Sequence, residues 1–195
     1  SVLHVNESNL VDALKTVWKS GYSERIFAYK KANNLELSGG IAIVIQAMID
    51  ADVAGVGFGF NAVTGDRAQV MISSTYGLGE GLVSGELDAD TYLVSKSGEI
   101  ERQIADKNRK MVRNSEAKAG TVYVEVEENL RKKNSLSDTH LIEIRNLLAR
   151  LYGHFNAYQD IEFAVKNDEL YLLQTRPITT VFIADSSGER IIWDS

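Results

Sequence analysis

Hydrophobic positions recur at helical spacing in two parts of the chain. In residues 7–20 the apolar side chains return every three or four positions, and Gly21 follows as a stop signal. Residues 22–32 continue this pattern with a second predicted helix. Further along, Ser137 is a suitable N-cap for a helix that Gly153 would end. The apolar stripe of that helix consists of Leu141, Ile144, Leu147, Leu148 and Leu151.

Between these helices the pattern becomes that of strands. Residues 41–49 (IAIVIQAMI) form a nearly continuous apolar run rich in β-branched residues, which predicts a strand buried on both faces. Residues 107–120 are polar and basic, which predicts a loop or short helix. Other strands are predicted at residues 54–60, 68–76 and 121–126, with a hairpin at 91–96 and 99–104. Because strands come in runs and helices lie at the ends, we expect an α+β fold.

One segment, YQDIEFAVKNDELYLLQTRP, reads as two strands around a polar turn. A three-residue connection, Asn167–Glu169, would place Glu162 opposite Gln174 and Asp160 opposite Arg176, all on one face. A two-residue connection would shift the register by one residue and turn Gln174 and Arg176 to the other face. The interpretation of one charged face therefore predicts an odd number of residues in the turn.

Such a face would suit a magnesium ion and a phosphate group. The Cβ atoms of Glu162 and Gln174 would be about 5 Å apart, so the Glu162 carboxylate and the Gln174 amide oxygen could both reach one cation. Mg²⁺ prefers such oxygen ligands together with phosphates and water. Arg176 would offer its guanidinium to a phosphate, and Asp160 would orient that arginine or a metal-bound water. A solvated face with a cross-strand Asp–Arg pair explains the same pattern and would contribute little stability.

Composition narrows the function classes. The 195 residues are 44% hydrophobic and 25% charged, which is typical of one globular domain. A net charge of −6 gives no support for nucleic-acid binding. The chain has no cysteine, which excludes disulfides and thiolate catalysis and fits a cytoplasmic location. The longest apolar region, residues 41–60, is interrupted by polar side chains, so no membrane partner is expected.

Four segments together carry a family resemblance: VIQAMI, GVGFGFNAVTGD, YGLGEGLVSGELDADTY and QDIEFAVKNDELYLLQTRPIT. Their order and spacing resemble the ATP-grasp nucleotide-binding domain of the phosphoenolpyruvate synthase and pyruvate phosphate dikinase family, which includes rifampicin phosphotransferases. The resemblance implies a mixed, largely antiparallel sheet with flanking helices. It also implies that residues 1–195 are the latter part of that domain, without its N-terminal lobe and without the downstream phosphohistidine domain.

The resemblance implies that MgATP phosphorylates a histidine on a separate swivelling domain, which passes the phosphoryl group to pyruvate or another small acceptor. Glu162 and Gln174 then correspond to the metal-binding pair, and Arg176 to the arginine on the transferred phosphates. Asp160 corresponds to a neighbouring functional aspartate, and Gln46 to a nucleotide-contacting glutamine. ATP and Mg²⁺ are the implied cofactors. The implied partners are the phosphohistidine domain and the N-terminal lobe.

Other residues are weaker candidates for a functional role. Glu80 is a second-rank metal ligand, and Lys107 lies in a charge run (DKNRK) that usually forms a solvated face. His4, His140 and His154 are expected to be structural or exposed. The residues Gly59-Phe60-Asn61-Ala62 replace the Thr-x-Asn-Pro of the family, which we expect to loosen that turn.

Three functions fit these observations. The first is the ATP-binding part of a dikinase-type phosphotransferase that is inactive by itself. The second is a nucleotide-binding or regulatory module that keeps the fold without catalysis. The third is a structural domain whose charged hairpin has no function.

Overall fold

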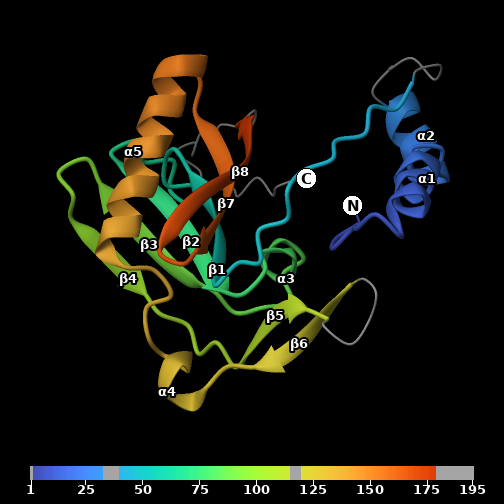
Figure 1. Ribbon diagram of the computed structural model, residues 1–195. Helices are drawn as coiled ribbons and strands as arrows, with labels where there is room; N and C mark the ends of the chain where they lie inside the picture. Colours follow the sequence, from blue (N-terminus) through green and yellow to red (C-terminus); the bar gives the residue numbers. More distant parts are fainter. Residues whose placement is uncertain (1, 33–39, 115–119, 179–195) are drawn as a thin grey trace. The chain divides into compact units, whose positions relative to one another are not determined.

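The computed structural model describes residues 2–32, 40–114 and 120–178 (Figure 1). The chain divides into two compact units, which are described separately. One unit comprises Ser1–Met48 and Arg113–Val122, and the other Ile49–Val112 and Tyr123–Ser195.

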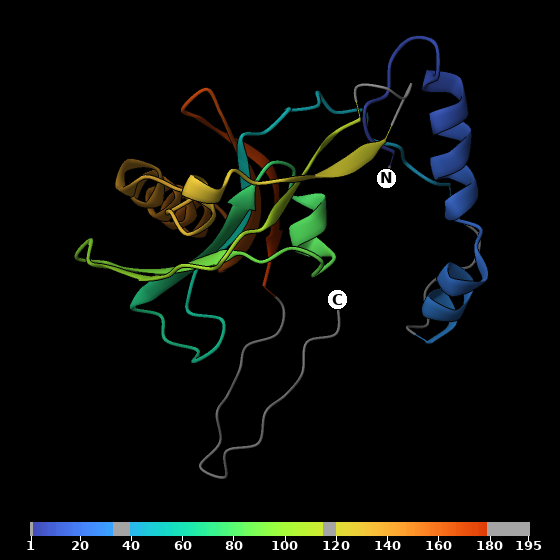
Figure 2. The ribbon, with the colours of Figure 1, turned by 90° about the horizontal axis from the view of Figure 1, so that it is seen from below.

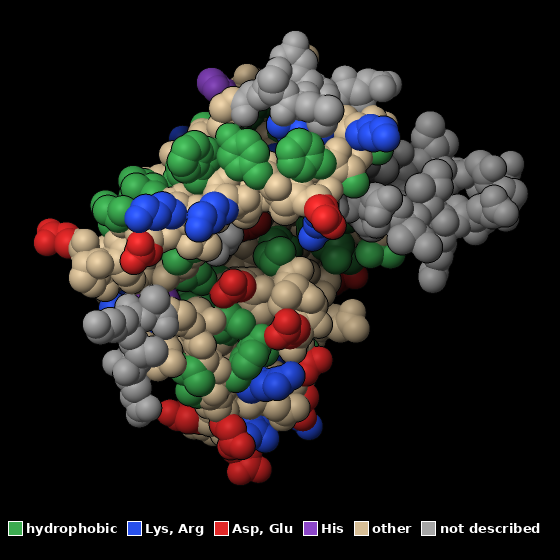
Figure 3. Space-filling view, turned by 90° about the vertical axis from the view of Figure 1, so that its right-hand side faces the viewer, with side chains coloured by type: hydrophobic (Ala, Val, Ile, Leu, Met, Phe, Trp, Pro, Cys, Tyr) green, Lys and Arg blue, Asp and Glu red, His purple; other side chains and the backbone are tan. Residues whose placement is uncertain are grey.

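The first unit contains the two predicted N-terminal helices, α1 (Leu10–Ser20) and α2 (Glu24–Ala32). Gly21 follows α1 directly, as predicted, and its N–H donates to the Trp18 carbonyl oxygen at 3.2 Å. Many large hydrophobic side chains of this unit are exposed, among them Val11, Trp18, Phe27, Tyr29, Val44 and Ile45. Figure 3 shows hydrophobic side chains lying among lysine and arginine side chains on the face that it presents.

The predicted strand at residues 41–49 is wrong. This segment forms neither helix nor strand, and Val44 and Ile45 are 84% and 70% exposed. A strand buried on both faces needs neighbours that accept and donate along both of its edges. None of the strands in the described part of the chain pairs with this segment. Its apolar composition therefore does not suffice to make it a strand.

A six-stranded sheet forms the centre of the second unit (Figure 1). Its strands follow the order β4-β3-β2-β1-β7-β8, and every neighbouring pair is antiparallel. The bounds are β1 Val53–Phe58, β2 Gln69–Tyr76, β3 Asp90–Ser95, β4 Ile100–Gln103, β7 Gln159–Lys166 and β8 Glu169–Pro177. The α+β class and the largely antiparallel sheet are thus confirmed.

Smaller elements connect these strands. They are α3 (Glu80–Val83), α4 (Glu128–Arg131) and the two-stranded sheet of β5 (Arg109–Arg113) and β6 (Thr121–Glu125). The prediction of a loop or short helix at residues 107–120 is therefore wrong for residues 109–113, which form β5. The charged residues at both of its ends concealed this strand, whose middle residue, Met111, is buried. The Met111 carbonyl oxygen accepts from Leu78 N–H at 2.8 Å.

The long helix α5 (Asp138–Phe155) lies along one face of the six-stranded sheet (Figures 1 and 2). As predicted, Ser137 caps its start, since the Ser137 hydroxyl accepts from His140 N–H at 3.2 Å. The helix ends two residues later than predicted, with Asn156 in the left-handed conformation.

The hydrophobic core fills the space between α5 and this face of the sheet. Every member of the predicted stripe of α5 contributes to it, either fully buried or packed against it at the margin. The sheet supplies Val53, Ile72, Tyr92, Val94, Ile161, Phe163 and Val165. At Gly57 an added Cβ would lie 3.1 Å from Ile161 and 3.4 Å from Ile144, so glycine permits the close approach of helix and strand.

The turn between β7 and β8 is shorter than predicted. Lys166 pairs with Glu169, so the turn holds only Asn167 and Asp168, whose φ values are 50° and 66°. Positive φ at both positions is typical of the two-residue hairpin turns that match strand twist. The prediction of an odd turn is therefore wrong.

A β-bulge compensates for the short turn. Phe163 pairs with Leu172, but its neighbour Glu162 pairs with Gln174, which leaves Leu173 as the extra residue of β8. The register shift that a two-residue turn imposes is thereby reversed halfway along the hairpin.

Each helix in the described residues is too short or too polar for a membrane-spanning segment.

Candidate functional site

The predicted pairing of polar residues across the hairpin is present. Glu162 lies directly opposite Gln174, and Asp160 directly opposite Arg176. Residues that face each other across an antiparallel pair share one face of the sheet. Because Ile161 and Phe163 point into the core, all four polar residues lie on the face turned away from α5. We call this the site face.

The register extends two rows of side chains across the site face. The first runs through Gln174, Glu162, Val56, Ser73, Thr91 and Gln103, and the second through Arg176, Asp160, Phe58, Met71, Leu93 and Glu101. Ser73 and Thr91, which sequence reasoning missed, add hydroxyl groups to the row that contains the predicted metal ligands. The sequence could have indicated both residues, because counting outward from the turns along the predicted strands places them in this row.

Asp160 and Arg176 form an ion pair. Arg176 Nε donates to Asp160 Oδ1 at 2.9 Å and to Oδ2 at 2.8 Å. The Asp160 side chain is 15% exposed and that of Arg176 is 61% exposed. Only Nε is engaged, so among the described residues the two terminal nitrogens of Arg176 make no hydrogen bond. The pair therefore fixes the guanidinium while leaving donors for an anion.

The donors at Glu162 and Gln174 fit a hard cation. Glu162 is half-buried, and its carboxylate has no hydrogen-bond or ion-pair partner among the described residues. The described residues contain no cluster of three or more His, Asp or Glu side chains suited to a metal ion. A magnesium ion needs only one or two protein oxygens when phosphates and water complete its shell. The pair meets that requirement, and the remaining ligands would have to come from a nucleotide.

The other predicted residues lie apart from the two rows. Gln46 is exposed and belongs to the first unit, so its contact with a nucleotide stays a prediction. Glu80 is an exposed residue at the start of α3. His140 is buried beneath the β7–β8 turn, and His154 is exposed and contacts the Phe155 ring. The expectation that these two histidines are structural or exposed agrees with these positions.

Lys107 departs from its expected solvated position. Its side chain is completely buried, and Nζ donates to Asp90 Oδ1 at 2.6 Å and to the Ala105 carbonyl oxygen at 3.2 Å. Asp90 Oδ2 accepts from Ser135 N–H at 2.8 Å and from the Tyr92 hydroxyl at 3.0 Å. Burial raises the pKa of the Tyr92 hydroxyl. The Asp90–Lys107 pair thus joins β3 to the segments before β5 and before α5.

Asn61 organises the turn after β1, where the family's Thr-x-Asn-Pro is replaced. Its side-chain oxygen accepts from Val63 N–H at 3.1 Å and from Thr64 N–H at 3.2 Å, and Asn61 N–H donates to the Asp66 carbonyl oxygen at 2.9 Å. Asn61 is also buried. The asparagine that the motif keeps therefore holds this turn, and the loosening expected from the loss of the threonine and the proline stays a prediction.

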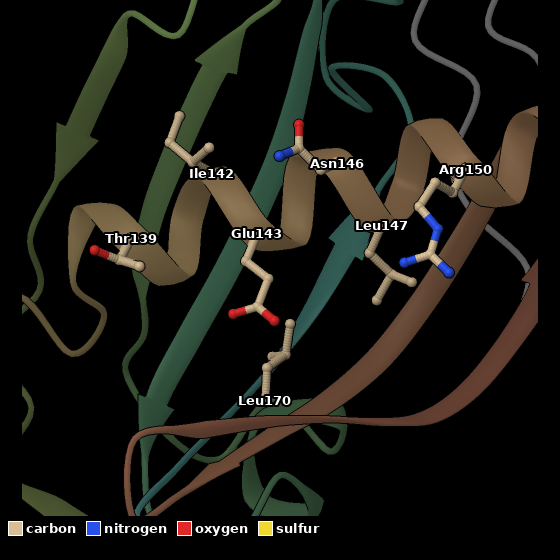
Figure 4. A pocket seen from close by; sticks show the side chains of 7 residues that line it. All are labelled: Thr139, Ile142, Glu143, Asn146, Leu147, Arg150 and Leu170. Atoms are coloured by element: carbon tan, nitrogen blue, oxygen red, sulfur yellow. The ribbon is translucent and has the colours of Figure 1, made fainter.

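A groove of about 490 Å³ lies on the other side of the sheet, between α5 and the start of β8 (Figure 4). Side chains of α5 and Leu170 line it, with Glu143 and Arg150 among them. It contains none of the residues predicted to bind a metal or a nucleotide. We place the candidate site on the site face, because the residues predicted to bind a metal and a phosphate lie there.

The fold and the site face define a sheet-based α+β domain that carries an arginine and two oxygen donors on one face of its sheet. Residues 1–190 match the family described as the pyruvate phosphate dikinase AMP/ATP-binding domain. The chain belongs to this family.

Several curated proteins resemble the chain. It is 38% identical over 181 residues to the prodigiosin synthesizing transferase PigC of Serratia marcescens, covering 91% of the chain and 20% of that protein. It is 36% identical over 182 residues to the phosphoenolpyruvate synthase of Pyrococcus furiosus, covering 89% and 22%. It is 29% identical over 179 residues to the rifampicin phosphotransferase of Bacillus cereus, covering 91% and 20%. The chain therefore spans about a fifth of the length of these relatives.

Proposed function

We propose that this chain is the MgATP-binding part of a dikinase-type phosphotransferase, in which ATP phosphorylates a histidine on a separate domain. Onward transfer would then reach pyruvate or another small acceptor. The observation that carries the proposal is the register of β7 and β8, which brings Glu162, Gln174 and the Asp160–Arg176 pair together on one face. Membership of an AMP/ATP-binding family supports the choice of nucleotide.

Each side chain has a defined task in this proposal. Glu162 and Gln174 would hold Mg²⁺, which would supply positive charge to neutralise the phosphates of the nucleotide. Arg176 offers its terminal N–H groups to the phosphoryl group as charge develops on it. Asp160 is a positioning residue, because it holds Nε of Arg176 and so aims the remaining nitrogens. Positioning and charge neutralisation are the main contributions a protein makes to phosphoryl transfer.

The proposal is tested in the whole protein that contains this chain. Glu162→Gln and Arg176→Ala are expected to abolish transfer of labelled phosphate from ATP to protein histidine. Glu101→Gln is the matched control, since Glu101 is an exposed carboxylate on the same face but near the β4 edge. Far-ultraviolet circular dichroism should remain unchanged in all three variants.

Two results would count against the proposal. Transfer at the parent rate in the Glu162→Gln variant would remove Glu162 from the mechanism. Nucleotide binding without any transfer in the parent protein would favour a non-catalytic nucleotide-binding module that has retained the fold.

A further inference from the structure

The β7–β8 turn is held on one side by Asp52, the residue before β1. Asp52 Oδ1 accepts from Lys166 Nζ at 2.8 Å, and Oδ2 accepts from Asn167 N–H at 2.9 Å. The hydrogen bond from Lys166 lowers the pKa of Asp52, and the bond from Asn167 adds to that effect. Asp52 N–H also donates to the Val165 carbonyl oxygen at 2.9 Å, which fixes the two segments to each other.

His140 of α5 holds the same turn from the other side. Its ring is buried, and Nε2 lies 3.2 Å from the Asp168 carbonyl oxygen and 3.3 Å from Asp168 Oδ1. Because both neighbours are acceptors, we assign a proton to Nε2. Nδ1 lies 2.9 Å from the Ser137 hydroxyl, which caps α5. The turn is therefore tied to the start of the helix as well as to β1.

This double hold matters because two arrangements of the hairpin keep Glu162 opposite Gln174. One is the observed arrangement, with a two-residue turn and a bulge at Leu173. The other has a three-residue turn, Asn167–Glu169, and no bulge. They differ in the side chain that faces Ala164: it is Tyr171 in the observed arrangement and Leu172 in the other.

We infer that Asp52 and His140 are positioning residues that hold the hairpin in its bulged register and thereby place Tyr171 on the site face. The functional part of this inference rests on the proposed function. In the observed register the Tyr171 row is adjacent to the Glu162–Gln174 row, two residues along β7 or about 7 Å. The Tyr171 hydroxyl donates to Glu169 Oε2 at 2.6 Å, which restrains the ring.

The position of Tyr171 gives it a role toward the nucleotide. A half-buried aromatic ring beside the metal ligands provides an apolar wall against which a base or ribose can pack. Leu172 in its place would supply a smaller and more mobile surface. Tyr171 would moreover turn toward the core side of the sheet in the three-residue arrangement, where its hydroxyl would need a new partner.

Paired cysteines can report the register, because the chain has none of its own. Val165→Cys/Leu170→Cys reports the observed arrangement, in which these two residues face each other. Such pairs lie within the Cα distance range of a disulfide. Val165→Cys/Tyr171→Cys reports the alternative arrangement. In the parent background we expect the first pair to close and the second to stay open.

The same two reporters are then placed in an Asp52→Ala/His140→Gln background. Closure of the 165–171 pair is expected to rise about tenfold as both holds are lost. Asp106→Ala/His154→Gln is the matched control background, since it removes an aspartate and a histidine that do not touch the turn. Unchanged closure of both reporters would overturn the inference. If the double variant does not fold, the single variants Asp52→Asn and His140→Gln provide the measurement, each with a smaller shift.

A nucleotide titration separates this inference from the proposed function. NMR spectra of the whole protein that contains this chain, labelled selectively at glutamate, glutamine and tyrosine, should show shifts at Glu162, Gln174 and the Tyr171 ring when millimolar MgATP is added. Shifts at Glu162 and Gln174 without any at Tyr171 would overturn the assignment of Tyr171 to the site. Absence of all three would count against the proposed function alone, because the disulfide measurement uses no nucleotide.

Discussion

Among single residues, Lys107 shows how a charge can become part of a core. Its ammonium group is fully buried against Asp90 and lies 5.5 Å from the centre of the Tyr76 ring. The sequence could not show this, because Lys107 belongs to a run of charged residues that is typical of an exposed face. The partner that neutralises it, Asp90, is distant in sequence, so only the fold brings the two together.

Removal of the ammonium group should destabilise the protein strongly. Lys107→Met leaves the Asp90 carboxylate buried without its cation, so we expect a loss of about 3–5 kcal/mol in the free energy of unfolding. Urea denaturation monitored by circular dichroism would measure it. The control is Lys132→Met, which breaks an ion pair that is 77% and 47% exposed and should change stability by less than about 1 kcal/mol. Equal effects from the two variants would contradict the structural role given to Lys107.

Among the secondary-structure elements, the β7–β8 hairpin shows both the reach and the limit of sequence reasoning. Alternation of polar and apolar residues predicted two strands, and the pairing of Glu162 with Gln174 and of Asp160 with Arg176 is confirmed. The three-residue turn is wrong. Counting residues cannot distinguish a longer turn from a shorter turn with a bulge, since each places the same number of residues between Lys166 and Gln174.

The bulge itself can be tested by deletion. Removal of one leucine from the Leu172–Leu173 pair would let β8 pair regularly while Glu162 stays opposite Gln174. We therefore expect phosphate transfer in the whole protein to be retained within about a factor of three, or ~0.65 kcal/mol in activation free energy. Removal of Thr175 is the contrasting variant, because it turns Arg176 toward the core side. Loss of transfer in the leucine deletion would show that the bulge has a catalytic role of its own.

The turn also predicts a dependence of stability on pH. Asp52 has a lowered pKa in the folded protein, so its contribution is complete above the pKa of an unfolded aspartate, about 3.9, and is lost as pH falls through the folded value. The stability difference between the parent and Asp52→Asn should therefore shrink steadily as pH falls below about 4. Thermal unfolding between pH 2.5 and 7 would reveal it. A constant difference over this range would exclude the ion pair as the cause.

For the whole molecule, the segment 41–49 marks where sequence-based prediction failed. Its composition is that of a buried strand, yet among the described residues it has no strand neighbour and much of it is exposed. Composition reports what a segment can become, whereas burial depends on what packs against it. The helices and the antiparallel sheet were predictable because their patterns are local or repeat between neighbouring strands.

The affinity of the isolated chain for nucleotide is a further prediction at this scale. The chain spans about a fifth of the length of its relatives, and we propose that a nucleotide needs contacts beyond those of the site face. Calorimetry with MgATP on the 195-residue chain is expected to show weak or undetectable binding. Micromolar affinity would show that the contacts present here suffice. Glu162→Gln should abolish whatever binding is measured.

The two faces of the central sheet differ in how freely their residues can be substituted during evolution. Substitutions beneath α5 alter packing and are filtered by the need to fold, whereas those at half-buried positions of the opposite face, such as Ser73, Thr91 and Tyr171, are less subject to that filter. Residues that meet a ligand can therefore drift, and acquire a new preference, at little cost to the scaffold. A library randomised at Ser73, Thr91 and Tyr171 would consequently contain many folded members with altered ligand selectivity.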